Sequence, residues 1–152
     1  MKRIIPLTPR RWLALEIFRR MKHERVEEHP LRQLFWECTL RCNVRCRHCG
    51  SDCKSSPATP DMPLQDFLKV LDSIATHTNP HDVFVIISGG EPTVREDLET
   101  CGKEISRRGY PWGMVCNGLC LTRERLHNLI RSGMRSICLL YTSPSPRDIS
   151  GS

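Results

Sequence analysis

Apolar segments of strand type alternate along the chain with segments in which apolar residues recur at helical spacing. The predicted strands are 33–38, 82–88, 112–116 and an incomplete 134–137. Helices are predicted to start at Asp61 and Pro63, to run from about 95 to 108, and to span 122–132. This alternation implies right-handed crossovers and a parallel sheet, so the sequence predicts an α/β fold. Segment 82–88 is apolar throughout, which is typical of a strand buried on both faces.

Unusual sequences follow three of the predicted strands. A cysteine-rich loop follows the first, Gly89-Gly90-Glu91-Pro92 follows the second, and Asn117-Gly118 follows the third. Because the carboxyl ends of parallel strands form one rim, where active sites collect, we expect these motifs to face the same cavity. The pattern does not distinguish an open flavodoxin-like sheet from a barrel-type sheet.

The cysteine-rich loop contains Cys42, Cys46 and Cys49 in the spacing C-x3-C-x2-C. Three thiolates on one short loop can hold three irons of a cubane cluster and leave the fourth iron open to a substrate-like molecule. A three-cysteine zinc module is an alternative, although zinc sites normally show paired C-x2-C units. A ferredoxin-like electron carrier with Cys38 or Cys53 as fourth ligand is another. Neither alternative explains the Gly-Gly-Glu-Pro sequence.

The cysteine spacing, the Gly-Gly-Glu turn and the Asn-Gly turn, in this order over residues 31–137, resemble the radical S-adenosylmethionine (radical SAM) superfamily. The resemblance implies the N-terminal half of a (β/α)6 partial TIM-type barrel, truncated within its fourth unit. In this family the open iron binds the methionine part of S-adenosylmethionine, and an electron from the cluster cleaves the cofactor to a deoxyadenosyl radical. The sequence flanking the cysteines resembles the branch that adds C-terminal auxiliary-cluster domains and modifies peptides or other proteins.

The same resemblance implies roles for individual residues and for partners. A 4Fe-4S cluster would be held by Cys42, Cys46 and Cys49, and S-adenosylmethionine would contact His48, Gly89, Gly90, Glu91 and Asn117. His48 would stack on the adenine, the glycine backbone and Glu91 would bind the methionine ammonium, and Asn117 would contact the ribose or methionine portion. A loop histidine satisfied by hydrogen bonds and an ordinary Asn-Gly turn are the alternatives. A reductant such as flavodoxin or ferredoxin and a peptide or small-molecule substrate are implied as partners.

Composition and charge bear on the cellular location and on two classes of partner, nucleic acids and membranes. The chain has nine cysteines, and without a secretion signal these indicate metal chemistry in a reducing compartment, so a cytoplasmic location is expected. The basic residues behind the formal charge of +6 are dispersed among acidic ones, and no nucleic-acid motif accompanies them. No apolar run approaches the roughly 18 residues that a membrane span needs. Neither a nucleic-acid partner nor a membrane is therefore expected.

The chain is predicted to have three parts. Residues 1–30 form an N-terminal extension with an amphipathic helix, in which Leu13, Ile17 and Met21 share a face and Thr8 caps the start. Residues 31–137 form an incomplete radical SAM core. Residues 138–152 resemble a translated sequencing adapter and are expected to be a non-native tail. We expect the chain to be the N-terminal fragment of a longer enzyme and inactive alone.

Overall fold

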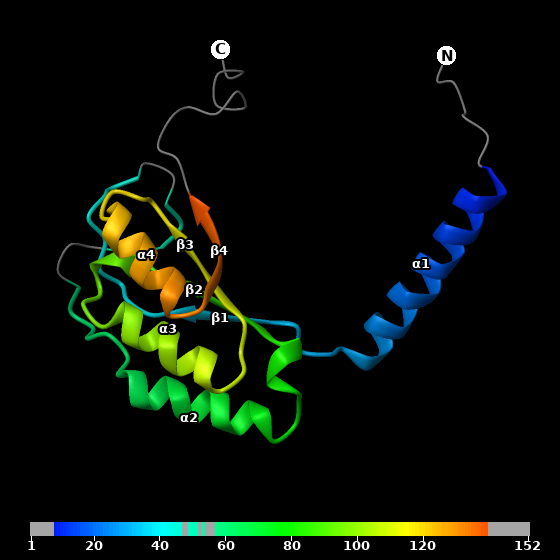
Figure 1. The fold of residues 1–152 in the computed structure, drawn as a ribbon, viewed down its shortest axis with the longest axis horizontal. Coiled ribbons are helices and arrows are strands. Elements are labelled where there is room, and N and C mark those ends of the chain that lie inside the picture. Colours follow the sequence, from blue (N-terminus) through cyan, green and yellow to red (C-terminus); the bar gives the residue numbers. More distant parts are fainter. Residues whose placement is uncertain (1–7, 47–48, 52, 54–56, 140–152) are drawn as a thin grey trace, which may run out of the picture. The chain divides into compact units, whose positions relative to one another are not determined.

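A computed structural model of the 152-residue chain describes residues 8–46, 49–51, 53 and 57–139. It divides the chain into two compact units, Met1–Leu31 and Arg32–Ser152. The first unit contains helix α1 (Pro9–Glu28), and the second contains a parallel sheet with its helices (Figure 1). Within the described residues, no helix has both the length and the apolar character that crossing a membrane requires.

Helix α1 starts as predicted but lacks the predicted single apolar face. The Arg11 amide donates to the Thr8 hydroxyl at 3.4 Å, at the start where a cap was expected. The exposed apolar side chains are Trp12, Leu13, Leu15, Ile17, Phe18, Met21 and Val26. The predicted stripe is present, but Trp12 and Phe18 lie off it, because apolar residues also occupy the intervening positions of the helical repeat. Apolar and charged residues are therefore both spread around the helix, and α1 is not amphipathic.

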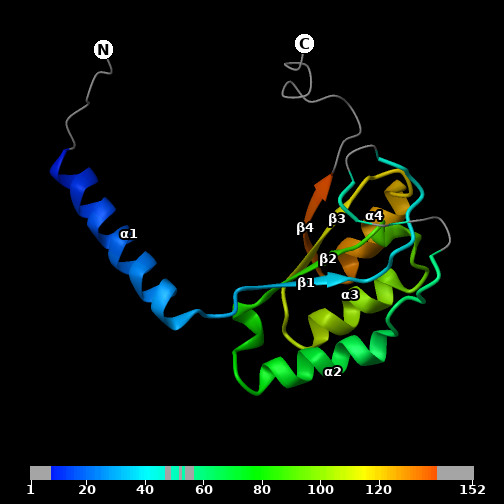
Figure 2. The ribbon, with the colours of Figure 1, turned by 180° about the vertical axis from the view of Figure 1, so that it is seen from behind.

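The second unit confirms the predicted α/β fold with a parallel sheet. Its strands are β1 (Gln33–Glu37), β2 (Phe84–Ser88), β3 (Trp112–Cys116) and β4 (Met134–Leu139), all parallel and in the order β1-β2-β3-β4. Helices α2 (Leu64–Ala75), α3 (Leu98–Arg107) and α4 (Arg123–Arg131) lie on the same side of this sheet (Figures 1 and 2). A doubly wound sheet has helices on both faces and reverses its strand order, which these four strands do not do.

The core lies between the sheet and its helices. The register places Val85 beside Trp112 and Ile87 beside Met114, and all four side chains are buried. Trp36 of β1 stacks on Phe67 of α2 with ring centroids 4.0 Å apart. The opposite face is more open: Phe35 is 61% exposed and Ile86 is half-buried. The expectation that segment 82–88 is buried on both faces is wrong for the described residues, because α2, α3 and α4 cover only one.

Several element boundaries differ from the prediction. Helix α3 begins at Leu98 rather than near 95, because the 3-10 turn η2 (Pro92–Val94) and the extended Arg95 come first. Strand β2 begins at Phe84, because the 3-10 turn η1 (Pro80–Asp82) precedes it. Strand β4 runs to Leu139, into the segment that was expected to be a non-native tail; residues 140–152 lie outside the described residues.

Glycines follow the ends of two helices. Gly109 follows α3 and Gly133 follows α4, with φ of 85° and 96°, a left-handed conformation that favours glycine. In α4, Leu129 is fully buried, whereas the adjacent Ile130 is 52% exposed. Only one of these adjacent positions can face the sheet, since neighbouring residues on a helix point in different directions.

Candidate cofactor site at the carboxyl edge of the sheet

The turn after β2 packs directly on the start of the cysteine loop. The Gly90 amide donates to the Thr39 carbonyl at 2.8 Å, and the Glu91 amide donates to the Arg41 carbonyl at 2.9 Å. A Cβ atom on Gly89 would lie 2.3 Å from the Thr39 oxygen, and one on Gly90 would lie 2.3 Å from the Arg41 oxygen. These glycines allow a close approach of the turn to the chain's own cysteine loop, whereas the sequence prediction concerned an approach to the cofactor.

The Glu91 carboxylate connects this turn to the loop after β3. The side chain is buried, at 1% exposure. Its Oε1 accepts hydrogen bonds from the Thr93 amide at 3.0 Å and the Thr93 hydroxyl at 2.5 Å, and its Oε2 accepts from the Asn117 amide at 2.7 Å. Three protein donors therefore already surround the carboxylate that the resemblance assigns to the methionine ammonium.

The loop after β3 in turn holds the cysteine loop. The Asn117 side-chain amide donates to Asn43 Oδ1 at 2.8 Å, and Asn43 Nδ2 donates to the sulfur of Cys120 at 3.1 Å. Asn117 Oδ1 also accepts from the Leu119 amide at 3.0 Å, which shapes the turn itself. The three motifs thus meet at one edge of the sheet, as their positions after successive strands predicted.

The three predicted cluster ligands lie on the accessible side of this edge. Cys42 is half-buried, and Cys46 and Cys49 are exposed. The Cys49 amide donates to the Cys46 carbonyl at 3.3 Å, and its thiol contacts the Ser51 carbonyl at 3.4 Å. Over the described ranges, no three or more His, Cys, Asp or Glu side chains are grouped as a metal site. His48 lies outside the described residues. The donor set nevertheless suits an iron–sulfur cluster, because the three thiols are accessible and share one loop.

The two cysteines considered as a fourth ligand differ in environment. Cys38 is completely buried, and burial raises the pKa of its thiol to about 12 although Arg95 acts in the opposite direction. Cys53 is half-buried, and burial followed by the negative charges of Cys49 and Cys42 raises the pKa of its thiol. Cys53 therefore lies near two of the predicted ligands, whereas Cys38 is buried in the core.

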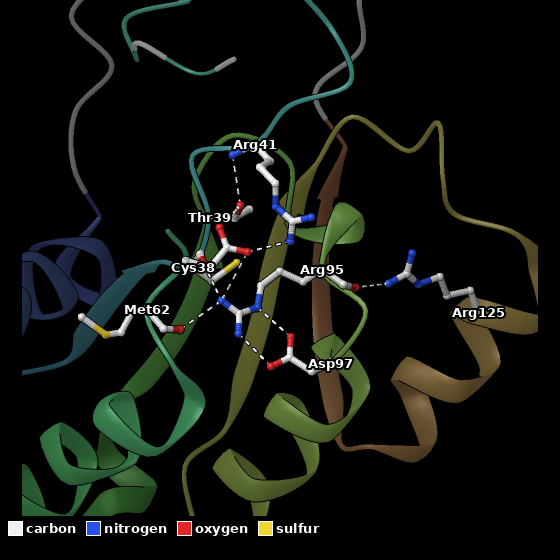
Figure 3. A network of polar contacts seen from close by, with 8 residues as sticks. Cys38, Thr39, Arg41, Met62, Arg95, Asp97 and Arg125 are labelled. Carbon is white, nitrogen blue, oxygen red and sulfur yellow. Dashed lines mark hydrogen bonds and ion pairs between the residues drawn. The ribbon is translucent and has the colours of Figure 1, made fainter. Parts of the chain in front are cut away.

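Two charged residues at the base of the cysteine loop were missed by the sequence interpretation. The sequence pattern predicts a helix start at Asp61 and places Arg95 at the beginning of a helix. In the structure Arg95 is only 4% exposed and belongs to a polar network with the cysteine loop (Figure 3). The available signal was a charged residue placed directly after the Gly-Gly-Glu-Pro turn, before any helical spacing begins.

The fold and the site define an α/β protein whose parallel strands end in a cysteine loop, a Gly-Gly-Glu turn and an Asn-Gly turn. Residues 36–149 match the family model of the Radical SAM superfamily. The chain therefore belongs to the radical SAM superfamily, a class of enzymes whose members bind a 4Fe-4S cluster and S-adenosylmethionine. The zinc-module and ferredoxin-like alternatives do not agree with this membership.

Curated relatives cover different chemistries. The tungsten-containing aldehyde ferredoxin oxidoreductase cofactor-modifying protein of Pyrococcus furiosus is 33% identical over 105 residues, which are 68% of this chain and 29% of that protein. The PqqA peptide cyclase of Bradyrhizobium diazoefficiens is 31% identical over 101 residues, 64% of this chain and 25% of that protein. Fe-coproporphyrin III synthase of Methanosarcina barkeri is 28% identical over 99 residues, 65% of this chain and 24% of that protein. The chain thus spans less than a third of each.

A solved structure shares the fold. The crystal structure of SeMet BtrN in an open conformation aligns with a TM-score of 0.63 and 15% sequence identity. The alignment covers 78% of this chain and 54% of that chain. At this identity the likeness concerns the arrangement of strands and helices alone.

Proposed function

We propose that residues 31–137 are the N-terminal part of a radical SAM core with a (β/α)6 partial TIM-type barrel. The support is the sequential parallel order β1-β2-β3-β4 with α2, α3 and α4 on one face, because a barrel adds its strands in this way. In such a barrel the open face with Phe35 and Ile86 would line the interior. Residues 1–30 would be an extension outside the core, whereas Cys138 and Leu139, which pair with β3 as part of β4, would belong to the core.

We further propose that Cys42, Cys46 and Cys49 hold a 4Fe-4S cluster in this core. The observation that carries this proposal is the bonding of the cysteine loop to both the Gly-Gly-Glu turn and the Asn117 loop at the carboxyl edge of the sheet. When bound, the cluster would supply the electron that cleaves S-adenosylmethionine to a deoxyadenosyl radical. The chain's own contribution is to bind and orient the two groups next to each other.

The roles of the cofactor contacts follow from what each group can offer. The methionine ammonium carries only donors, so among the backbone groups of Gly89 and Gly90 it requires the carbonyls. The Gly90 amide is itself a donor and is already bonded to the cysteine loop, so it would not contact the ammonium. The Glu91 carboxylate, which three protein donors hold in one orientation, would bind the ammonium. His48 would stack on the adenine, and Asn117 would contact the ribose or methionine portion.

Specific observations support two classes of substrate. Modification of a peptide or protein is our first proposal, supported by the resemblance of the cysteine flanks and by the similarity to a PqqA peptide cyclase. A small-molecule substrate is the second, supported by the similarity to Fe-coproporphyrin III synthase and to heme synthases. Either reaction would need an electron donor such as flavodoxin or ferredoxin.

The proposal is tested on the full-length protein, reconstituted with iron and sulfide without oxygen. The wild type should assemble one cluster through Cys42, Cys46 and Cys49, and replacing these three together by alanine should remove the absorbance and the bound iron that belong to that cluster. Cys53→Ala serves as the matched control and should retain both. Adding S-adenosylmethionine should change the electron paramagnetic resonance spectrum of the reduced cluster. A triple variant that still assembles the cluster, or an unchanged spectrum at saturating cofactor, would contradict the proposal.

A further inference from the structure

The two ends of the cysteine loop meet at one arginine. Nη1 of Arg95 donates to the Cys38 carbonyl at 2.6 Å and lies 3.2 Å from the Met62 carbonyl, which it also contacts as a donor. Cys38 ends the approach from β1, and Met62 precedes helix α2, so these carbonyls flank residues 39–61. A single buried nitrogen therefore bridges the entry and the exit of the loop that carries the three predicted cluster ligands (Figure 3).

A carboxylate at the exit makes a second connection to the entry. Asp61 Oδ1 accepts from the Thr39 hydroxyl at 2.6 Å, and Asp61 Oδ2 accepts from the Arg41 guanidinium at 2.6 Å. Arg95 Nη1 lies 3.9 Å from Asp61 Oδ2 and adds a second positive neighbour, after Arg41, on the same carboxylate. Burial by itself would raise the pKa of Asp61, but these hydrogen bonds and charges outweigh it and lower the pKa. The group is therefore a carboxylate at neutral pH.

Arg95 is itself held firmly by the segment after the Gly-Gly-Glu turn. Its Nε and Nη2 donate to the two oxygens of Asp97, both at 2.8 Å, and its guanidinium lies 5.3 Å from the ring centroid of Trp36. The backbone on either side is fixed by Arg125, which donates to the Arg95 carbonyl at 2.7 Å and to the Thr93 carbonyl. The guanidinium therefore links the β2–α3 segment to the base of the cysteine loop and fixes the two relative to each other.

We infer that Arg95 and Asp61 are positioning residues that close the neck of the cysteine loop, meaning the paired ends at Cys38–Arg41 and Asp61–Met62. By closing the neck they hold the predicted cluster ligands at a fixed place relative to the Gly-Gly-Glu turn. Neither residue touches a reacting atom. The inference rests on the proposed function for the identity of the bound group, and on the contacts above for the neck itself.

The shape of the guanidinium, and not only its charge, is what the neck requires. Arg95 donates to Asp97 through Nε and Nη2, which form one edge of the planar guanidinium. Its third nitrogen, Nη1, donates to two backbone carbonyls. A lysine ammonium keeps the charge but gathers its donors on one nitrogen, so it cannot serve both sides at once. Arg95→Lys therefore separates geometry from charge, and Asp61→Asn removes the charge at the exit while preserving the side-chain shape.

The control variant is Arg108→Lys. Arg108 also pairs with two carboxylates, Asp72 and Glu104, but these lie on α2 and α3 and not in the neck. All variants are made in the full-length protein. Two quantities are measured: the rate of iron loss from the reconstituted protein to a chelator, and the alkylation rate of the half-buried Cys42 in the protein without cluster, read by mass spectrometry. Thermal unfolding of the cluster-free proteins reports on the fold.

Arg95→Lys and Asp61→Asn should each raise the iron-loss rate and the Cys42 alkylation rate by about tenfold, which corresponds to the loss of one hydrogen bond to a charged group. Arg108→Lys should change neither rate by more than about twofold. Wild-type rates in both neck variants, or an equal acceleration in Arg108→Lys, would overturn the inference. If Arg95→Lys does not fold, Asp61→Asn decides. If the wild type assembles no cluster, the proposed function fails, and the Cys42 alkylation rate still tests the neck.

Discussion

Replacing Gly90 by alanine tests whether the Gly-Gly-Glu turn must touch the cysteine loop. A Cβ at this position would lie 2.3 Å from the Arg41 carbonyl oxygen and 2.8 Å from the Arg41 carbonyl carbon. Both contacts are with backbone, which cannot rotate away as a side chain can. Gly90 is not among the glycines with a positive φ, so the effect of alanine is steric and not conformational. The turn and the loop must therefore separate.

The expected loss of stability can be estimated from the contacts that this separation breaks. The hydrogen bonds from the Gly90 amide to Thr39 and from the Glu91 amide to Arg41 are each worth about 0.5–1.5 kcal/mol. Forcing an extra methyl group into a close-packed site costs a further ~1–3 kcal/mol. We therefore expect Gly90→Ala to lower the free energy of unfolding by about 2–6 kcal/mol, a large part of the 5–15 kcal/mol that is typical of a domain.

The assay is denaturant unfolding of the cluster-free full-length protein, together with iron bound after reconstitution. Gly50→Ala is the neutral control, because among the described residues no atom other than those of its chain neighbours lies within 4 Å of the added Cβ. Gly102→Ala is the destabilised control, because its Cβ would lie 2.2 Å from the Trp112 ring in the core, away from the site. Gly90→Ala should lose both stability and bound iron, and Gly102→Ala mainly stability. A Gly90→Ala protein as stable as Gly50→Ala would refute the reasoning.

Three further predictions follow from buried charges and thiols. Glu91→Gln should lower the free energy of unfolding by about 1–3 kcal/mol, because its amide nitrogen cannot accept from the donors around the carboxylate; an unchanged denaturation midpoint would contradict this. The pKa of Asp97 is lowered, chiefly by hydrogen bonds from its partner arginine, so its contribution is complete above about pH 4 and is lost as the pH falls through the folded-state pKa. Stability measured from pH 6 to pH 3 should therefore fall less steeply in Asp97→Asn than in the wild type. At pH 8, Cys38, with a pKa of about 12 and no exposure, should resist alkylation in the native state while the exposed Cys46 reacts; equal rates would contradict the burial of Cys38.

Local sequence patterns were sufficient to predict the order of the helices and strands and the location of the candidate site. The helical spacing of Phe67, Leu68 and Leu71 marks α2, and the apolar run around Val85 and Ile87 marks β2, because burial against one neighbouring layer imposes a period on the sequence. The convergence of the strand-end motifs followed from the rule that parallel strands end at one edge. The cysteine spacing led to the superfamily because ligand chemistry restricts both residue type and separation.

Tertiary contacts decided what the individual site residues do. Nothing local in the sequence indicates that Gly90 makes room for Arg41, or that the Glu91 carboxylate accepts the amide that follows β3, because each partner comes from a distant segment. The same holds for Arg95, which the sequence pattern assigns to a helix. In the structure its buried guanidinium donates hydrogen bonds to both ends of the cysteine loop. A buried charge is stable only with partners. Asp97 supplies one of them from two residues away, but the two carbonyls that Arg95 bridges come from distant segments and are brought to it by the packing of β1, β2 and α2.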